Sequence, residues 1–172
     1  EMVQVASRLV GEHLGADRCY FCEWLEDERR VRVAEDWSAV AGTPSLAGIH
    51  DLADFGPADW RLRLATGNFS VADIAADPLA VPFRAAYEAL QVRAYATSRF
   101  VRQERGTVTV AATMAVPRSW RPDELALLED VVSRVWPLVE RARAQPALAQ
   151  GEELFRSLAD RAPVGIFLCD AH

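Results

Sequence analysis

The stretch Val92–Pro117, which reads VRAYATSRFVRQERGTVTVAATMAVP, predicts a β-hairpin at the centre of the fold. Two runs rich in β-branched and aromatic residues flank a short charged link that ends at Gly106, which is a strong hairpin signal. Side chains alternate between the two faces of a strand, so Tyr95, Thr97 and Arg99 share one face. We therefore expect one small, apolar face that packs on helices and one partly polar face that borders a functional space.

Length and composition narrow the class of protein. The chain has 172 residues, 51% of them hydrophobic, which suits one domain with a fragment of a second. The net charge of -6 and the scattered arginines argue against nucleic acid as a partner. No apolar run reaches the roughly 20 residues of a membrane span. The odd number of cysteines, 3, disfavours a disulfide framework, and we expect a cytoplasmic protein.

The chain before the hairpin alternates short elements with loops. The periodicity of apolar residues predicts a helix over Met2–Leu14 that ends at Gly15. Further elements follow in order: strands at 18–26 and 30–37, a loop at 38–56, a helix at 57–66, a strand at 68–71 and a helix at 82–90.

The chain after the hairpin predicts a long helix over Pro122–Gln145, which continues with a bend through Pro137. Tight hairpins make the sheet antiparallel, and the terminal helices have the length to cover one of its faces, which gives an α+β domain. Both terminal helices then lie on one side, where they form a homodimer interface with a second copy. The apolar stripe of the last helix supplies that interface: Leu125, Leu128, Val132, Val135 and Val139.

Four strings together resemble a GAF domain: LGADRCYFCEW, SLAGIHDLADFGPADWRLRLATGNFSVADI, YEALQVRAYATSRFV and SWRPDELALLEDVVSRVW. The resemblance implies a central antiparallel sheet of about five or six strands, with short helices and loops covering a pocket opposite the terminal helices. It assigns residues 1–145 to this domain. The tail, EELFRSLADRAPVGIFLCDA, is similar to the opening of a PAS domain, so we expect 146–172 to be a linker helix and a truncated PAS start.

The resemblance implies a regulatory sensory and dimerisation domain of a larger bacterial signalling protein, in first place a sensor histidine kinase. A ligand or partner signal would pass through the terminal helices to the downstream PAS and output modules. A ligand-free dimerisation spacer is the main alternative. A third possibility is an enzyme, a GAF-type methionine sulfoxide reductase; otherwise the fragment itself is not expected to be an enzyme and has no predicted catalytic residue.

Bilin-binding relatives carry Cys-His shortly before a tyrosine in the helix that precedes the hairpin. If Tyr87 is that tyrosine, Phe83 and Arg84 stand at the Cys-His positions, and Thr113 replaces a bilin-contacting histidine of the sheet. The sequence therefore predicts no bilin and no other cofactor, and leaves the small-molecule ligand unidentified. A bilin photosensor stays a less favoured alternative, like the sulfoxide reductase.

The candidate ligand-binding residues lie on the polar hairpin face and in the segments that resemble the pocket cover. Arg99 either anchors a carboxylate or phosphate, or pairs with an internal acid such as Asp54. The threonines either donate hydrogen bonds to a ligand or fill the strands, and the aromatic residues either stack on a flat ligand or pack in the core. The predicted pocket residues are Asp54, Phe55, Trp60, Tyr87, Tyr95, Thr97, Arg99 and Thr113.

Metal and redox chemistry find little support in the sequence. Cys19 and Cys22 have the spacing of a metal or redox pair, but residues three apart on a strand face opposite sides. No second pair accompanies them, and His13, His50 and His172 are scattered. We predict no metal site.

Overall fold

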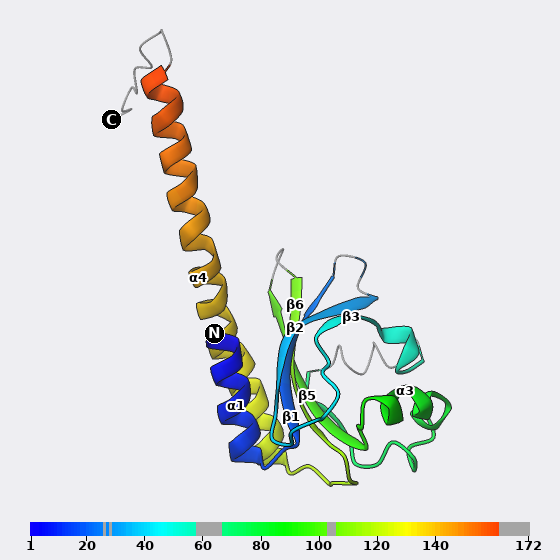
Figure 1. Ribbon diagram of the computed structural model, residues 1–172. Coiled ribbons are helices and arrows are strands. Elements are labelled where there is room, and N and C mark those ends of the chain that lie inside the picture. Colours follow the sequence, from blue (N-terminus) through cyan, green and yellow to red (C-terminus); the bar gives the residue numbers. More distant parts are fainter. Residues whose placement is uncertain (26, 28, 58–66, 103–105, 162–172) are drawn as a thin grey trace. The chain divides into compact units, whose positions relative to one another are not determined.

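A computed structural model of the chain describes residues 1–25, 27, 29–57, 67–102 and 106–161, with side chains described as far as residue 144 except that of residue 102. Its centre is a 6-stranded sheet in the order β3-β2-β1-β6-β5-β4, and neighbouring strands in this sheet are antiparallel. The strands are β1 (Arg18–Trp24), β2 (Arg30–Ser38), β3 (Gly48–Asp51), β4 (Phe69–Val71), β5 (Ala94–Arg102) and β6 (Gly106–Met114). Figure 1 shows this sheet between helices on two sides, which confirms the α+β prediction.

The first helix, α1, spans Met2–Leu14, the bounds that its periodicity predicts. Gly15 ends it in the left-handed conformation, with φ 58°, where a glycine avoids the strain of a side chain. Gly11 lies against the indole of Trp37 so closely that a Cβ atom at this position would overlap the ring. This glycine therefore lets α1 approach β2 closely.

The central hairpin pairs β5 with β6 from Ala94↔Met114 to Arg102↔Gly106. Gly106 has φ 97°, which suits the turn between the strands. The predicted difference between the faces is present. Ala94, Ala96 and Ala112 on the small face are completely buried, which leaves room for helices to pack on the sheet.

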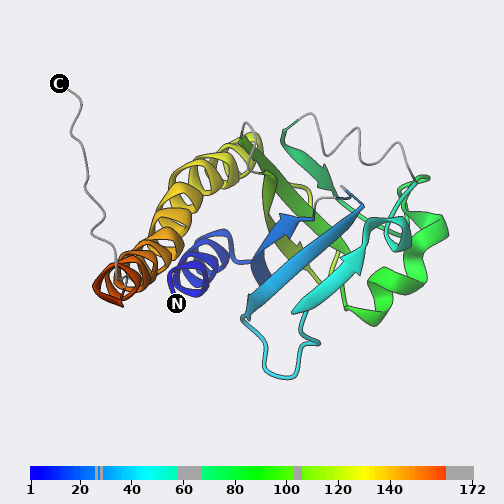
Figure 2. The same cartoon turned by 90° about the horizontal axis from the view of Figure 1, so that it is seen from above.

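One layer of helices covers the small face: α1 and the first turns of α4, as Figure 2 shows. Phe21 of β1 stacks on Trp136 of α4, with ring centroids 6.3 Å apart. Helix α4 spans Pro122–Arg161, so it continues through Pro137 and past the predicted end at Gln145. The chain divides into two compact units, Glu1–Trp136 and Pro137–His172, and the predicted domain boundary after residue 145 stays a prediction.

Short elements lie on the opposite face of the sheet. They are the 3₁₀ turns η1 (Leu52–Asp54) and η2 (Val81–Phe83) and the helix α3 (Arg84–Ala89). Strand β3 and η1 occupy a stretch that the sequence predicts as loop, because Gly48-Ile-His-Asp lacks the alternation of a strand. The predicted helix at 57–66 falls, apart from Pro57, outside the described residues.

The predicted dimer stripe on α4 needs a correction. Leu128 and Val132 are completely buried within the single chain, because this side of α4 packs toward the sheet. They are therefore core residues and not a partner surface. Leu125 and Val135 are half-buried, and Val139, in the second unit, is buried.

Within the described residues, no helix is both long and apolar enough to cross a membrane.

Candidate functional site

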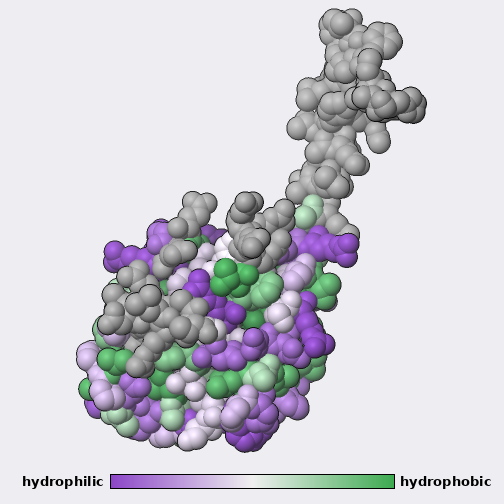
Figure 3. Space-filling model, turned by 180° about the vertical axis from the view of Figure 1, so that it is seen from behind, coloured by the Kyte–Doolittle hydropathy of each residue, from purple (hydrophilic) through white to green (hydrophobic). Residues whose placement is uncertain are grey.

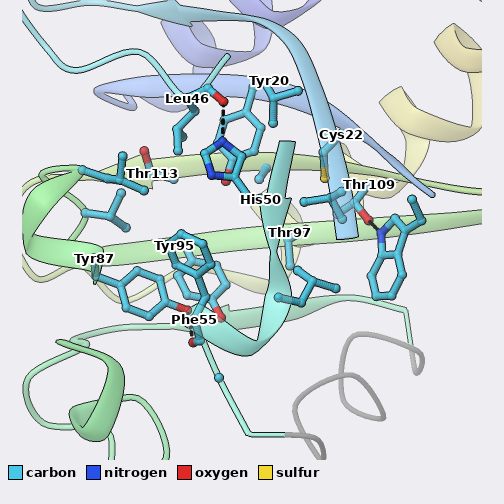
Figure 4. A pocket seen from close by; sticks show the side chains of 18 of the residues that line it. Tyr20, Cys22, Leu46, His50, Phe55, Tyr87, Tyr95, Thr97, Thr109 and Thr113 are labelled. Carbon is cyan, nitrogen blue, oxygen red and sulfur yellow. Dashed lines mark hydrogen bonds between the residues drawn. The ribbon is translucent and has the colours of Figure 1, made fainter. Parts of the chain in front are cut away.

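A cavity of about 310 Å³ lies between the polar face of the sheet and the short elements that cover it. This volume is within the usual range of small-molecule pockets, ~300–1,000 Å³. Figure 4 shows side chains from the strands and from the cover converging on it. The sheet contributes, among others, Tyr20, Cys22, Trp24, Val31, Val33, Tyr95, Thr97, Thr109, Ala111 and Thr113, and the cover contributes Leu46, Leu52, Phe55, Tyr87 and Leu90.

Aromatic rings form one wall of the cavity. Phe55 meets Tyr87 edge-on with ring centroids 5.4 Å apart, and Tyr87 stacks on Tyr95 at 6.0 Å with an interplanar angle of 14°. The Tyr87 hydroxyl donates a 2.7 Å hydrogen bond to the Phe55 carbonyl, which ties η1 to α3. Such a wall offers flat, polarizable surfaces to a conjugated ligand.

Several polar groups on the other walls form hydrogen bonds within the protein. The Thr97 hydroxyl donates to the Val110 carbonyl at 3.0 Å, and Thr109 accepts a 2.8 Å hydrogen bond from the Trp24 indole. His50 Nε2 lies 2.7 Å from the Leu46 carbonyl, so this nitrogen carries the proton and donates it (Figure 4).

Burial keeps several ionisable groups of the cavity neutral. Desolvation raises the pKa of the Cys22 thiol to about 12, and it also raises the pKa of the Tyr20 and Tyr87 phenols. Among the described lining residues there is no carboxylate, and the cation is Arg29, whose guanidinium binds Asp51 at 2.9 Å. The interior thus suits a ligand with a large apolar, conjugated body.

Five predicted pocket residues do line the cavity: Phe55, Tyr87, Tyr95, Thr97 and Thr113. They come from the polar face of the hairpin and from the segments that resemble the pocket cover. Whether they bind a ligand stays a prediction.

Of the other three predicted pocket residues, two lie away from the cavity and one falls outside the described residues. Asp54 is exposed and borders a separate shallow hollow on the surface. Arg99 lies beyond the cavity, where it donates to the Thr107 hydroxyl at 3.0 Å and stacks 4.9 Å from the Trp24 ring centre. Its described contacts are therefore Thr107 and Trp24 rather than Asp54, and anion binding by Arg99 stays a prediction. Trp60 lies outside the described residues.

Tyr20, Trp24 and His50 line the cavity but are missing from the sequence prediction. The period-two rule applied to β1 would have found the first two, because Arg18, Tyr20, Cys22 and Trp24 alternate with the helix-facing Cys19 and Phe21. His50 carries no comparable signal, since β3 is too short to show alternation.

Cys19 and Cys22 face opposite sides of β1, as expected for residues three apart on a strand. Cys22 faces the cavity, whereas Cys19 is completely buried, and both are free thiols. The residues that the structure describes contain no cluster of three or more His, Cys, Asp or Glu side chains suited to a metal ion.

The chain belongs to the GAF domain family, whose model matches residues 1–137. None of the curated proteins compared with the chain matches its sequence. The family assignment therefore rests on the family model and agrees with the fold of the sheet and its cover.

Solved structures of similar fold include photoreceptor domains. The blue-light absorbing form of the PixJ GAF domain from Thermosynechococcus elongatus has a TM-score of 0.67 at 18% identity, covering 94% of this chain and 92% of that one. A phycocyanobilin-bound GAF domain from a cyanobacterial phytochrome has a TM-score of 0.70 at 16% identity, covering 84% and 87%. A far-red absorbing protein with bound biliverdin has a TM-score of 0.69 at 18% identity, covering 82% and 89%.

These structures overturn the prediction that the domain has no cofactor, since solved domains of the same fold hold bilins. The prediction was wrong because it rested on missing motif residues: Phe83 and Arg84 at the Cys-His positions, and Thr113 in place of a histidine. The Cys-His positions concern one way of attaching a bilin covalently. They say nothing about a cavity that holds a conjugated ligand by stacking and hydrogen bonds.

Proposed function

We propose that this GAF domain is a sensory domain that binds an elongated conjugated ligand of the linear tetrapyrrole (bilin) class in its cavity. The observation that carries the proposal is the cavity itself, with stacked rings of Phe55, Tyr87 and Tyr95 on one wall and hydroxyl groups of the sheet on another. Solved GAF domains of similar fold hold phycocyanobilin and phycoerythrobilin, and another solved structure of similar fold holds biliverdin. A cavity that the protein's own side chains leave unfilled also favours ligand binding over the ligand-free spacer.

Each group of residues has a distinct task in such a site. The rings of Tyr87 and Tyr95 stack on the conjugated system, and Thr113 and Tyr20 are placed to exchange hydrogen bonds with its pyrrole nitrogens or carbonyl oxygens. A bilin supplies visible-light absorption when bound. The residues of this chain constrain its conformation, exclude water from it and form hydrogen bonds with it.

We propose that binding is non-covalent. Among the described residues Cys22 is the thiol that lines the cavity, and its pKa of about 12 leaves little of the nucleophilic thiolate at neutral pH. The pigment should therefore leave the protein when the fold is lost.

Absorption spectroscopy tests the proposal. The purified protein is titrated with biliverdin and, separately, with phycocyanobilin. We expect a saturable change of the visible band and an induced circular dichroism signal, both abolished in acidic urea, after which the pigment separates from the chain. Spectra identical to those of the free pigments at every protein concentration would exclude a bilin site.

The output we propose is conformational. The strands that line the cavity also carry Cys19 and Phe21 on their other face, and Phe21 stacks on Trp136 of α4. A ligand-dependent shift of β1 would thus reach a terminal helix directly. The proposal includes the wider context expected from the sequence: a cytoplasmic sensor histidine kinase with a PAS domain after residue 145.

We propose no catalytic role for the fragment. Desolvation raises the pKa of both Cys19 and Cys22 to about 12, which disfavours the thiolates that a methionine sulfoxide reductase needs. The two thiols also lie on opposite faces of β1, so they cannot form a disulfide without rebuilding the strand.

We further propose that the domain forms a homodimer, with α1 as the described part of the interface. Met2, Val5 and Leu9 share one side of this helix and are 44%, 45% and 53% exposed. The face of the molecule drawn in Figure 3, by contrast, mixes hydrophobic and hydrophilic residues among those it colours. The α1 stripe replaces Leu128 and Val132 as the proposed contact.

A further inference from the structure

Arg18 is the most deeply buried charged side chain among the described residues, with 1% of its side chain exposed. It begins β1, between Ser38 of β2 and Thr113 of β6. A guanidinium in such a place is costly unless other groups replace its water. The identity of its partners therefore shows what the residue holds in place.

The partners of Arg18 belong to two other segments. Its Nε lies 3.5 Å from the carboxylate of Asp36 in β2, and its Nη2 donates a 3.0 Å hydrogen bond to the Leu90 carbonyl. Leu90 ends α3, where the last carbonyls of a helix have no partner within the helix. Arg18 thus ties the end of α3 to the sheet.

Asp36 extends the connection to the other side of the cover. Its carboxylate accepts hydrogen bonds from the Ser45 hydroxyl at 2.6 Å and from the Leu46 amide at 3.0 Å. Leu46 and Leu90 both line the cavity. A continuous set of polar contacts, centred on Arg18, therefore joins the two cover segments behind the cavity.

The Arg18 site is poorly explained by stability alone. Nε has the 3.5 Å ion-pair contact with Asp36 but no hydrogen bond, and Nη1 has no hydrogen-bond partner among the described residues. Burial also lowers the pKa of the guanidinium. Well-packed apolar residues often stabilise a protein core as well as a buried ion pair does. What such residues would not supply is the directional attachment of two separate segments to one strand.

We infer that Arg18 is a positioning residue. Through Asp36 and the Leu90 carbonyl it holds the Ser45–Leu46 segment and the end of α3 at the spacing that closes the cavity. The inference rests on the proposed function in that the cavity is the ligand site. Its main test needs no ligand, so the two proposals can fail separately.

The two strand thiols report local and global opening. Cys22 lines the cavity, and Cys19 is buried elsewhere in the fold. A small reagent such as methyl methanethiosulfonate reaches Cys22 when the cover opens, but reaches Cys19 when the sheet and helices separate. Two single-thiol chains, one with Cys19→Ala and Cys169→Ser and one with Cys22→Ala and Cys169→Ser, allow both rates to be measured by mass spectrometry.

We expect Arg18→Met to raise the modification rate of Cys22 by at least about tenfold. The modification rate of Cys19 should change only as much as the global stability of the fold changes. Arg18→Lys keeps the charge but loses the forked geometry, and should give an intermediate rate. The matched control is Arg118→Met, which removes a partly buried arginine that pairs with Glu124 at the start of α4. This control should change the rates at Cys22 and Cys19 by the same factor.

The double variant Arg18→Met with Asp36→Leu removes the buried charge penalty and keeps the test valid if Arg18→Met alone does not fold. Fast modification of Cys22 in a chain of recovered stability supports positioning. Equal acceleration of the modification of both thiols, or an unchanged rate at Cys22, overturns it.

With biliverdin as probe, the same variants should release pigment faster. Absence of any pigment binding in the parent chain would contradict the bilin proposal and leave the thiol result standing.

Discussion

Cys19 and Cys22 illustrate at the scale of single residues how burial sets chemistry. The two thiols are 0% and 7% exposed, and desolvation raises the pKa of each from 9.0 to about 12. Both therefore stay protonated in the folded protein under conditions in which they ionise in the unfolded chain. This difference links the stability of the fold to pH.

The free energy of unfolding should fall as the pH rises from about 9 to about 12. In that window the folded protein retains protons that the unfolded chain has lost, so each increase in pH favours the unfolded state. Urea unfolding at a series of pH values measures the slope. The variant with Cys19→Ala and Cys22→Ala should show a smaller slope; equal slopes in both proteins would contradict the assignment.

Tyr87→Phe should lower the free energy of unfolding by about 1 kcal/mol, the usual contribution of one hydrogen bond. The variant keeps the ring against Phe55 and Tyr95 but loses the 2.7 Å hydrogen bond from the hydroxyl to the Phe55 carbonyl. Chemical denaturation provides the measurement. A free energy of unfolding that equals that of the parent chain would show that this bond does not hold the cover.

Arginines mark the limit of prediction from the sequence at this scale. Arg99 lies on the predicted strand face but stacks on Trp24 instead of entering the cavity. Arg18, beside Asp17 at the start of a strand, gives no sign in the sequence that it is buried. Alternation predicts the face of a strand on which a side chain lies, whereas reach and burial depend on segments distant in the sequence.

At the scale of elements, α1 packs on β2 through a contact that depends on a missing side chain. Gly11 lies inside the helix, where alanine would ordinarily stabilise by roughly 0.5–1 kcal/mol. Here a Cβ atom would overlap the Trp37 ring. The sign of the effect should therefore reverse.

Gly11→Ala should reduce the free energy of unfolding by about 1–3 kcal/mol, the range for overpacked sites. Gln4→Ala, at an exposed position of the same helix, is the matched control and should be neutral or slightly stabilising. Adding Trp37→Leu to Gly11→Ala should restore part of the loss. A stabilised Gly11→Ala protein would show that α1 does not pack on Trp37 in this way.

Elements with a local signal were predictable, and elements that depend on pairing were not. The bounds of α1 follow from its periodicity and from Gly15, and the hairpin follows from alternation around Gly106. Strand β3 forms because Arg30–Val33 of β2 offers it an edge, a partner that its own residues do not reveal. The continuation of α4 to Arg161 also differs from the predicted end of the helix at Gln145.

At the scale of the whole molecule, the proposed dimer makes α1 a surface between two copies. Leu9→Glu places a charge in the middle of the apolar stripe and should shift the protein toward monomer by at least about tenfold in the dissociation constant. Sedimentation velocity over a range of concentrations measures this shift. Gln4→Glu, on another side of the helix, should leave the dissociation constant unchanged. A parent chain that is monomeric at all concentrations would contradict the dimer.

The central claim is that the cavity on the polar face of the sheet is the ligand site, and a cavity-filling variant tests it most directly. Ala111 lines the cavity on β6, so Ala111→Phe fills part of its volume without introducing charge. Val101→Phe, at an exposed position 59% accessible on β5, adds the same ring outside the cavity. The measurement is the equilibrium binding isotherm of biliverdin for the three proteins. The account predicts one site per chain in the parent and in Val101→Phe, and at least about a hundredfold weaker binding in Ala111→Phe; equal affinity in all three proteins would contradict it.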